Sequence, residues 1–138
     1  MRDFIFRGKG KDDGGWLEGS LMVWSGGCRH ICSEQPDGKM SKAPVDPATV
    51  GQFTGLLDNN GTRIFEGDIL HFPGQYADKQ QVVFDKGGFC VGEFYQERFD
   101  VLWSLRVAAE RTEYNKGEDG CEIIGNIHDN PELLEAQQ

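Results

Sequence analysis

Short apolar runs separated by turn-forming residues are the main pattern along this sequence. The clearest turn is Asn60-Gly61, which stands between the apolar pairs Leu56-Leu57 and Ile64-Phe65. Asn-Gly suits the positive φ values of a type I′ turn, so we expect a tight hairpin here. A second hairpin is expected over residues 81–91, where a Lys-Gly-Gly turn separates two runs of β-branched and aromatic residues.

Further strands are predicted on both sides of these hairpins. Residues 4–6 and 15–24 are rich in apolar side chains and are separated by a polar turn over residues 9–14. Glu66-Gly67-Asp68 is expected to form a bend that enters a strand, and Pro73-Gly74 is expected to end that strand. Consecutive strands with short connections are typical of a small meander or barrel.

The C-terminal part predicts one more strand and a short helix. Residues 120–128 read as a strand, and an Asn-Pro start predicts an N-capped helix or turn over residues 130–134. Residues 99–114 fit both strand and helix, because apolar side chains alternate at first but residues 105–114 contain no Gly or Pro. We favour a strand that passes into a short helix ending near residues 116–117.

Residues 33–47 are the strongest candidate for a loop. They contain three prolines and a Pro-Asp-Gly turn, but few large apolar side chains. The whole chain has 138 residues, enough for one domain or one domain with a small subdomain, and its 19 glycines suit many turns. We therefore expect a folded, mainly β protein with one or two short helices.

Acidic residues outnumber basic ones, and most of the excess lies in the second half. The chain has 14 basic and 23 acidic residues and a net charge of −9, which opposes binding to a phosphate backbone. Residues 1–61 have a net charge of −1 and residues 62–138 a net charge of −8. The acidic run 110–122 is expected to be a solvated face, or alternatively a surface that contacts a basic protein or mimics nucleic-acid charge.

The composition also bears on location and on nucleic-acid binding. No apolar run approaches the roughly 20 residues of a membrane span, and residues 1–8 lack a signal-peptide core, so we expect a soluble, cytoplasmic protein. Four aromatic residues near the N-terminus suit base stacking. Because basic residues are not interleaved through the acidic half, a role in the core or in protein contact is favoured for Phe4, Phe6, Trp16 and Trp24.

The best metal-binding candidate is the run Cys28-x-His30-x-Cys32. Thiolate and imidazole are good zinc ligands, and alternate residues of a strand share one face. In an extended strand, however, the three residues are spread over roughly 13 Å, so a turn is needed to bring them together. A fourth ligand would have to come from a distant part of the chain: Cys90, Cys121, His71 or His128. We expect no metal and no other cofactor, and treat Cys28, His30 and Cys32 as weak candidates.

No set of catalytic residues stands out. None of the three histidines lies in a recognisable nucleophile motif. Glu66 and Asp68 resemble an acid/base pair, but carboxylates beside a glycine bend more often accept hydrogen bonds from nearby backbone N–H groups. Cys90 and Cys121 lie in predicted strands and are expected to be buried free thiols. We therefore expect a protein that is not an enzyme.

Several sequence blocks, taken in order, resemble the YopX family of small proteins encoded by bacteriophages and prophages. A single Glu-Gly-Asp-Ile motif would mean little, but the ordered set spans nearly the whole chain. The blocks are Phe6-Arg7-Gly8-Lys9, Gly15-Trp16-Leu17-Glu18-Gly19-Ser20-Leu21, Thr49-Val50-Gly51-Gln52-Phe53-Thr54-Gly55-Leu56, Asp58-Asn59-Asn60-Gly61, Ile64-Phe65-Glu66-Gly67-Asp68-Ile69 and Glu122-Ile123-Ile124-Gly125-Asn126-Ile127-His128-Asp129-Asn130-Pro131-Glu132-Leu133.

This resemblance implies a fold but no activity. It implies an N-terminal β region over residues 1–61, with a variable loop at 33–47, and a C-terminal SH3-like barrel over residues 62–138. The family has no established activity, so no role is carried over to any residue. The run from Cys28 to Cys32 and the proline-rich loop depart from the family pattern, and any function specific to this member is expected there.

The function expected from the residues and the resemblance together is non-enzymatic. We expect a phage- or prophage-derived protein of the bacterial cytoplasm that binds an unknown phage or host protein, or itself as a homo-oligomer. Two alternatives stay open: a small metal-dependent hydrolase using Cys28, His30 and Cys32, and a nucleic-acid-associated or charge-mimicking phage protein. Direct binding of nucleic acid is not expected at this net charge.

Overall fold

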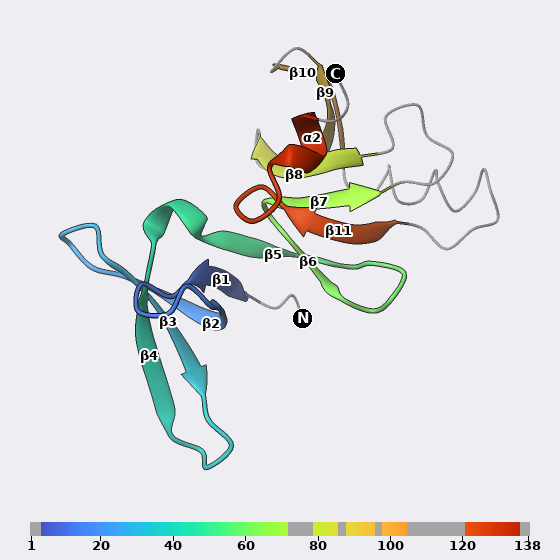
Figure 1. Cartoon of the computed structure of the whole chain (residues 1–138). Helices are drawn as coiled ribbons and strands as arrows, with labels where there is room; N and C mark the ends of the chain where they lie inside the picture. Colours follow the sequence, from blue (N-terminus) through green and yellow to red (C-terminus); the bar gives the residue numbers. More distant parts are fainter. Residues whose placement is uncertain (1–3, 72–78, 86–87, 96–97, 105–120, 136–138) are drawn as a thin grey trace. The chain divides into compact units, whose positions relative to one another are not determined.

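The protein is mainly β. A computed structural model describes residues 4–71, 79–85, 88–95, 98–104 and 121–135. Its strands form two antiparallel sheets, of six and five strands, and helix is confined to one 3₁₀ turn and one short helix among these residues (Figure 1). The predicted β fold class is thus confirmed. None of the described helices is long and apolar enough to cross a membrane.

The chain divides into two compact units, Met1–Phe53 and Thr54–Gln138. The sequence analysis placed a division after residue 61 instead, and the assignment of two separate domains stays a prediction. The sheet of the first unit has the order β4-β3-β2-β1-β5, and β6 extends this order beyond β5. Its elements are β1 (Phe6–Lys9), β2 (Trp16–Val23), β3 (Arg29–Glu34), β4 (Met40–Val45), the 3₁₀ turn η1 (Pro47–Thr49) and the start of β5 (Gly51–Leu57), whose remaining residues belong to the second unit.

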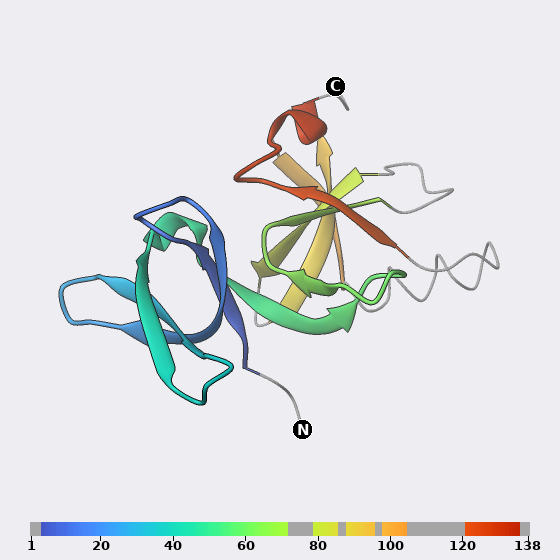
Figure 2. The same cartoon turned by 60° about the horizontal axis from the view of Figure 1, so that its bottom comes forward.

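The first unit closes on itself. Gly10, just after β1, forms a β-bridge with Val45 at the end of β4. Two backbone hydrogen bonds flank this bridge, from the Lys11 N–H to the Pro44 carbonyl at 3.0 Å and from the Asp46 N–H to the Lys9 carbonyl at 2.8 Å. Strands β1 to β4 therefore form a ring, which Figure 2 shows. Val45 is fully buried, and Ile31 of β3 is almost fully buried.

The predicted loop at residues 33–47 is in large part a hairpin. The end of β3 and all of β4 lie in this segment. The two strands pair from Arg29 opposite Val45 to Glu34 opposite Met40. Residues 35–39, which include the Pro-Asp-Gly turn, connect them. The prediction failed because the first half of β4 is exposed, so its sequence carries little apolar signal although its backbone is paired. Pro44 is tolerated because it lies near the end of an outer strand.

The second unit contains the five-stranded sheet, of order β10-β9-β8-β7-β11. Its core is apolar and includes Ile64, Leu70, Val82, Val91 and Cys121. The SH3-like barrel expected over residues 62–138 is not confirmed by these strands. The elements are β6 (Arg63–Phe65), β7 (Asp68–His71), β8 (Lys79–Asp85), β9 (Gly88–Tyr95), β10 (Arg98–Ser104), β11 (Glu122–Asn126) and α2 (Glu132–Glu135).

The hairpin at Asn60-Gly61 is present, but its turn is not type I′. The Asp58 N–H donates to the Thr62 carbonyl at 2.9 Å, and the Gly61 N–H donates to the Asp58 carbonyl at 3.0 Å. The loop therefore has three residues and ends on Gly61, whose φ of +80° needs a glycine. The Asp58 side chain also accepts from the Asn60 and Thr62 N–H groups, which favours the longer loop.

The remaining predicted elements are largely present. Strands β8 and β9 form the second hairpin, and the expected C-terminal strand and helix correspond to β11 and α2. The first strand lies at Phe6–Lys9, later than the predicted residues 4–6. Of residues 99–114, those up to 104 belong to β10, and the expected short helix lies outside the described residues. Pro73-Gly74 also lies outside them.

Candidate functional site

The outer side of the β2–β4 sheet carries a tryptophan that is held in place but still exposed. Trp24 directly follows β2 and keeps 46% of its surface exposed. Its indole Nε1–H donates to Nδ1 of His30 at 2.9 Å, and the two rings meet edge to face with centroids 6.0 Å apart. The hydrogen bond and the ring contact together fix the orientation of the indole.

A lysine completes this cluster from the neighbouring strand. Nζ of Lys42 lies 5.2 Å from the centroid of the Trp24 ring, within the range of a cation–π interaction. We call Trp24, His30 and Lys42 the Trp24 cluster. Its members come from the end of β2, from β3 and from β4, so the cluster exists only when these three strands are paired.

Strand register explains why these side chains meet outside the core. His30 lies opposite Met22 and Pro44, whereas Ile31, the next residue of β3, points to the opposite face and is buried. Side chains alternate between faces along a strand, so the cluster lies on the outward face. Met40 lies two residues before Lys42 on β4 and is 63% exposed, which adds apolar surface beside the cluster.

A second tryptophan of the first unit also contacts cations. The guanidinium carbon of Arg7 lies 4.6 Å from the centroid of the Trp16 ring, and Nζ of Lys9 lies 5.6 Å from it. Register accounts for this, because Lys9 pairs with Trp16 and Arg7 with Glu18, so these side chains share one face of the β1–β2 pair. The first unit therefore has basic residues beside both of its tryptophans, a placement that the sequence did not reveal.

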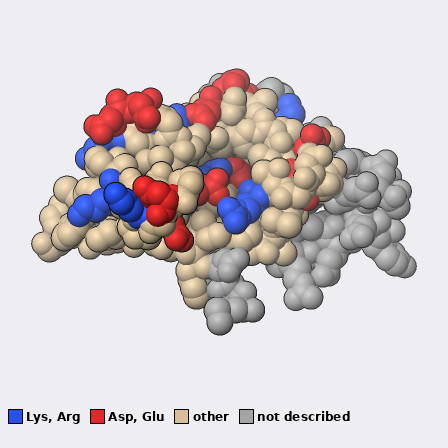
Figure 3. All heavy atoms as spheres, turned by 90° about the horizontal axis from the view of Figure 1, so that it is seen from below, with Lys and Arg blue, Asp and Glu red and all other residues tan. Residues whose placement is uncertain are grey.

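Charge is divided unequally between the two units. Residues 1–53 contain seven basic and seven acidic residues and are neutral overall, whereas residues 54–138 contain seven basic and sixteen acidic residues. The second unit thus carries the entire net charge of −9. Figure 3 shows basic and acidic side chains of the described residues close together on one face of the molecule.

The three weak metal candidates lie in β3 and in the turn before it. Cys28 is exposed in the turn, while His30 and Cys32 are half-buried on one face of the strand. Nδ1 of His30 is already occupied by Trp24. Within the described part of the chain, no group of three or more His, Cys, Asp or Glu side chains is placed to hold a metal ion. The expected absence of a metal stays a prediction.

The carboxylates around Gly67 have a structural arrangement. Asp68 is buried, and its Oδ2 accepts a hydrogen bond of 2.7 Å from the Phe65 N–H across the Glu66-Gly67 turn. This is the backbone-capping role that the sequence favoured over acid/base chemistry. His71, at the end of β7, is partly exposed, as expected for a strand residue.

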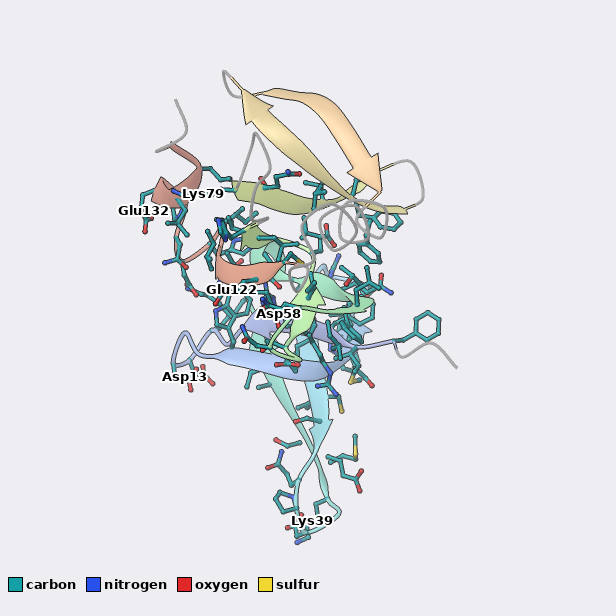
Figure 4. All side chains as sticks on the ribbon, turned by 90° about the vertical axis from the view of Figure 1, so that its right-hand side faces the viewer. Asp13, Lys39, Asp58, Lys79, Glu122 and Glu132 are labelled. Carbon is teal, nitrogen blue, oxygen red and sulfur yellow. The ribbon has the colours of Figure 1, made fainter. Side chains whose placement is uncertain are left out.

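In the second unit, a buried carboxylate, Asp58, lies near a buried thiol, Cys121. Oδ1 of Asp58 accepts from the Asn60 and Thr62 N–H groups at 2.9 Å each, and Oδ2 accepts from the Ile123 N–H at 3.1 Å. Burial, together with the negative charge of Asp58, raises the pKa of the Cys121 thiol from 9.0 to about 11. Cys121 is thus a buried free thiol, as predicted, whereas Cys90, for which burial was also predicted, is half-buried. Figure 4 labels Asp58 and Glu122, the first residue of β11.

The model of the family described as YopX protein matches residues 6–135. The chain belongs to the YopX family. The resemblance seen in the sequence blocks is therefore confirmed. YopX is not a known enzyme family, and no curated protein matches the chain at a significant level.

A solved structure is similar to this YopX chain over nearly all of its sequence. The crystal structure of protein EF1440 from Enterococcus faecalis matches it with a TM-score of 0.57 and 26% sequence identity. The match covers 97% of this chain and 99% of that one, so the similarity extends over nearly all of both chains. The neighbour's description names no activity, ligand or partner.

Sequence reasoning missed Lys42 as a member of the site in this YopX protein. Lys42 lies in the segment expected to be a loop, where no partner for Trp24 was sought. The Pro-Asp-Gly turn between Ile31 and Val45 was the available signal, because a turn flanked by apolar residues indicates a hairpin. With that hairpin recognised, the period of two places His30 and Lys42 on the same face.

Proposed function

We propose that this YopX protein is a phage- or prophage-derived, non-enzymatic interaction protein that binds a protein partner in the bacterial cytoplasm. The observation that carries the proposal is Trp24, which keeps nearly half of its surface exposed although a hydrogen bond and a cation fix its position. Tryptophan is among the residues that most often dominate binding energy at protein interfaces.

The Trp24 cluster has the physical properties of a binding surface. A fixed aromatic ring offers a large contact area and loses little side-chain entropy when a partner covers it. Met40, which is exposed two residues before Lys42 on β4, adds apolar area on the same face, while Lys42 supplies a charge that fixes orientation. Aromatic residues and methionine are enriched in protein interfaces.

The positions of the candidate catalytic and metal-binding residues support a binding function more than a hydrolase. Of the weak metal candidates, His30 and Cys32 lie in β3 and Cys28 lies in the turn before it, and the imidazole Nδ1 of His30 already accepts a hydrogen bond from Trp24. The buried Asp68 carboxylate accepts a hydrogen bond from the Phe65 N–H, which is a structural role. Binding is therefore the function that these contacts support best.

The test is an affinity capture from lysates of host cells, with and without phage infection, analysed by mass spectrometry. The Trp24→Ala protein is compared with wild type and with Phe84→Ala. Phe84 is the matched control, because it is also a half-exposed aromatic residue but lies on β8 of the second unit. We expect Trp24→Ala to reduce recovery of a specific protein at least about tenfold, the loss of a typical hot-spot side chain.

Two results would contradict the proposal. One is recovery of the same proteins by wild type and Trp24→Ala. The other is capture that disappears when the lysate is treated with nuclease, because this would identify a nucleic acid as the bound species. The second result would favour the nucleic-acid alternative, which the Arg7 and Lys9 contacts with Trp16 support.

A further inference from the structure

The loop between β5 and β6 contains an asparagine whose side chain is open to reaction. Asn60 is exposed, and within the described part of the chain no hydrogen bond holds its side-chain amide. The next residue is Gly61, where an added side chain would meet no heavy atom within 4 Å. No neighbouring side chain therefore shields the Gly61 backbone nitrogen. Figure 1 shows this loop between the strands labelled β5 and β6.

An asparagine followed by a glycine undergoes an intramolecular reaction that releases ammonia. The Gly61 nitrogen, having lost its proton to solvent, attacks the side-chain carbon Cγ of Asn60. A C–N bond forms, and the amide nitrogen takes up a proton and leaves as ammonia. Water then opens the five-membered succinimide ring at one of its two carbonyl carbons, which leaves either an aspartate or an isoaspartyl link. Glycine favours the attack because it has no Cβ to hinder it.

Hydrogen bonds of the folded loop oppose the first step. The Gly61 N–H donates to the Asp58 carbonyl at 3.0 Å, and the attack requires this nitrogen to lose its proton. The Asp58 carboxylate also accepts from the Asn60 and Thr62 N–H groups at 2.9 Å each, which fixes the backbone on both sides of Gly61. The reaction therefore needs a transient opening of the loop.

The other asparagines of the described residues lack this combination of features. Asn130 precedes a proline, which has no N–H to lose. Asn126 is buried, and its side-chain Nδ2 donates to Asp129 at 3.2 Å. Asn59 is exposed, but the residue after it has a side chain that hinders the attack. The structure thus distinguishes one asparagine from its neighbours.

We propose that Asn60 is a site of spontaneous deamidation, and that the hydrogen bonds of Asp58 set its rate by keeping the loop closed. This inference does not depend on the proposed binding function, because the loop lies in the second unit and Trp24 in the first. The product adds a negative charge to the loop, and the isoaspartyl form also lengthens its main chain. Both changes weaken the hydrogen bond from the Ile123 N–H to Asp58, and with it the attachment of β11.

Peptide mapping by mass spectrometry follows the reaction during incubation at mildly alkaline pH. We expect folded wild type to accumulate aspartyl and isoaspartyl products at Asn60 and not at Asn59, Asn126 or Asn130. Wild type unfolded in urea should react at Asn60 at least about tenfold faster, because opening the folded loop breaks hydrogen bonds to a buried carboxylate. Asn60→Gln is the control for the site, since its longer side chain forms the ring far more slowly.

Asp58→Ala tests the part assigned to the carboxylate. The folded variant is expected to deamidate at Asn60 at least about threefold faster than folded wild type, because its loop opens more often. Asp37→Ala is the matched control, since Asp37 also accepts a backbone N–H in a turn, but in the first unit. If circular dichroism shows Asp58→Ala to be unfolded, wild type in urea below its unfolding transition replaces it, and its rate should rise with urea.

The outcomes decide the site and its control separately. Folded wild type that modifies Asn60 no faster than Asn59 overturns the site. Equal rates in folded and unfolded wild type overturn the protective role of the loop, and so does an unchanged rate in folded Asp58→Ala. In the purified isoaspartyl form, the Ile123 amide should exchange its hydrogen faster, whereas the Ile31 amide of the first unit should not change. An unchanged Ile123 amide would overturn the predicted effect on β11.

Discussion

The thiol of Cys121 shows how burial changes the chemistry of a single residue. It is 3% exposed, and the carboxylate of Asp58 lies near enough to disfavour a thiolate. Both effects keep the proton on sulfur, and a protonated thiol is a poor nucleophile. Cys28, by contrast, is exposed in a turn. Oxidation or labelling of the folded protein is therefore expected at Cys28 before Cys121.

Stability at alkaline pH should reflect the Cys121 pKa. The folded protein keeps the Cys121 proton up to about pH 11, while the unfolded chain releases it above pH 9.0. The unfolded state thus binds fewer protons in this window, so stability falls as the pH rises through it, by about 2 to 3 kcal/mol at most. We expect the loss between pH 9 and 11, measured by urea unfolding, to be smaller in Cys121→Ser.

Other groups titrate in the same pH range, so the effect of Cys121 is measured as the difference in stability between wild type and Cys121→Ser. Equal losses of stability in wild type and in Cys121→Ser would contradict the prediction. Below pH 9 the thiol is protonated in both states, and the difference between the two proteins is expected to be independent of pH.

For single residues, the sequence predicted burial and local hydrogen bonds better than it predicted contacts between distant residues. It predicted that Cys121 is a buried free thiol and that Asp68 caps a backbone N–H, because both follow from neighbouring residues. It did not predict that Asp58 binds the Ile123 N–H, because the two residues are 65 positions apart. It also missed Lys42 in the Trp24 cluster, since that contact depends on the pairing of β3 with β4.

Among the elements, the connection between the β5–β6 hairpin and β11 depends on one carboxylate. Asp58 accepts three backbone N–H groups, two from its own loop and one from β11. Asn59 adds a backbone bond, because its N–H donates to the Cys121 carbonyl at 2.9 Å. These hydrogen bonds add to the apolar packing of Leu56, Ile64 and Ile123, which belong to one core cluster.

Asp58→Ala should destabilise the protein substantially. The substitution leaves three backbone N–H donors without their acceptor, at a residue that is only 7% exposed. We therefore expect a loss of about 2 to 4 kcal/mol in the free energy of unfolding. Asp37→Ala is the control, because Asp37 accepts a single backbone bond, from Lys39, in an exposed turn. Its loss should be below about 1 kcal/mol. Similar losses in both variants, measured by denaturant unfolding, would argue against the role assigned to Asp58.

Elements were predicted well where a turn signal lay between apolar runs. The hairpins at residues 56–65 and 81–91 and the C-terminal strand have such signals, and all are present. The β3–β4 hairpin was missed because half of its second strand is exposed and that strand contains a proline. A close approach of backbones is also hidden in the sequence: a side chain on Gly19 would overlap the Cys32 carbonyl oxygen, which requires glycine in β2.

For the molecule as a whole, the uneven charge of the two units has consequences for stability. Like charges repel each other more when they are brought together by folding, and dissolved salt screens this repulsion. The second unit carries the net charge of −9, and the first unit is neutral. Salt should therefore act on the two units differently.

We expect added salt to stabilise the second unit selectively. In hydrogen exchange at low protein concentration, core amides such as those of Leu70 and Val82 should exchange more slowly at about 300 mM than at about 10 mM salt. Amides of Ile31 and Val45, in the core of the first unit, serve as the internal control and should change little. Equal slowing in both units would refute the electrostatic explanation.

The ring formed by β1 to β4 has a consequence for how the first unit folds. The bridge between Gly10 and Val45 joins the two ends of this four-strand segment, so it forms only after the intervening hairpins have brought those ends together. Contacts between residues far apart in sequence slow folding, because the chain must be ordered before they form. The closing bridge is thus expected to be a late event, and once it has formed it opposes the separate opening of any of the three hairpins.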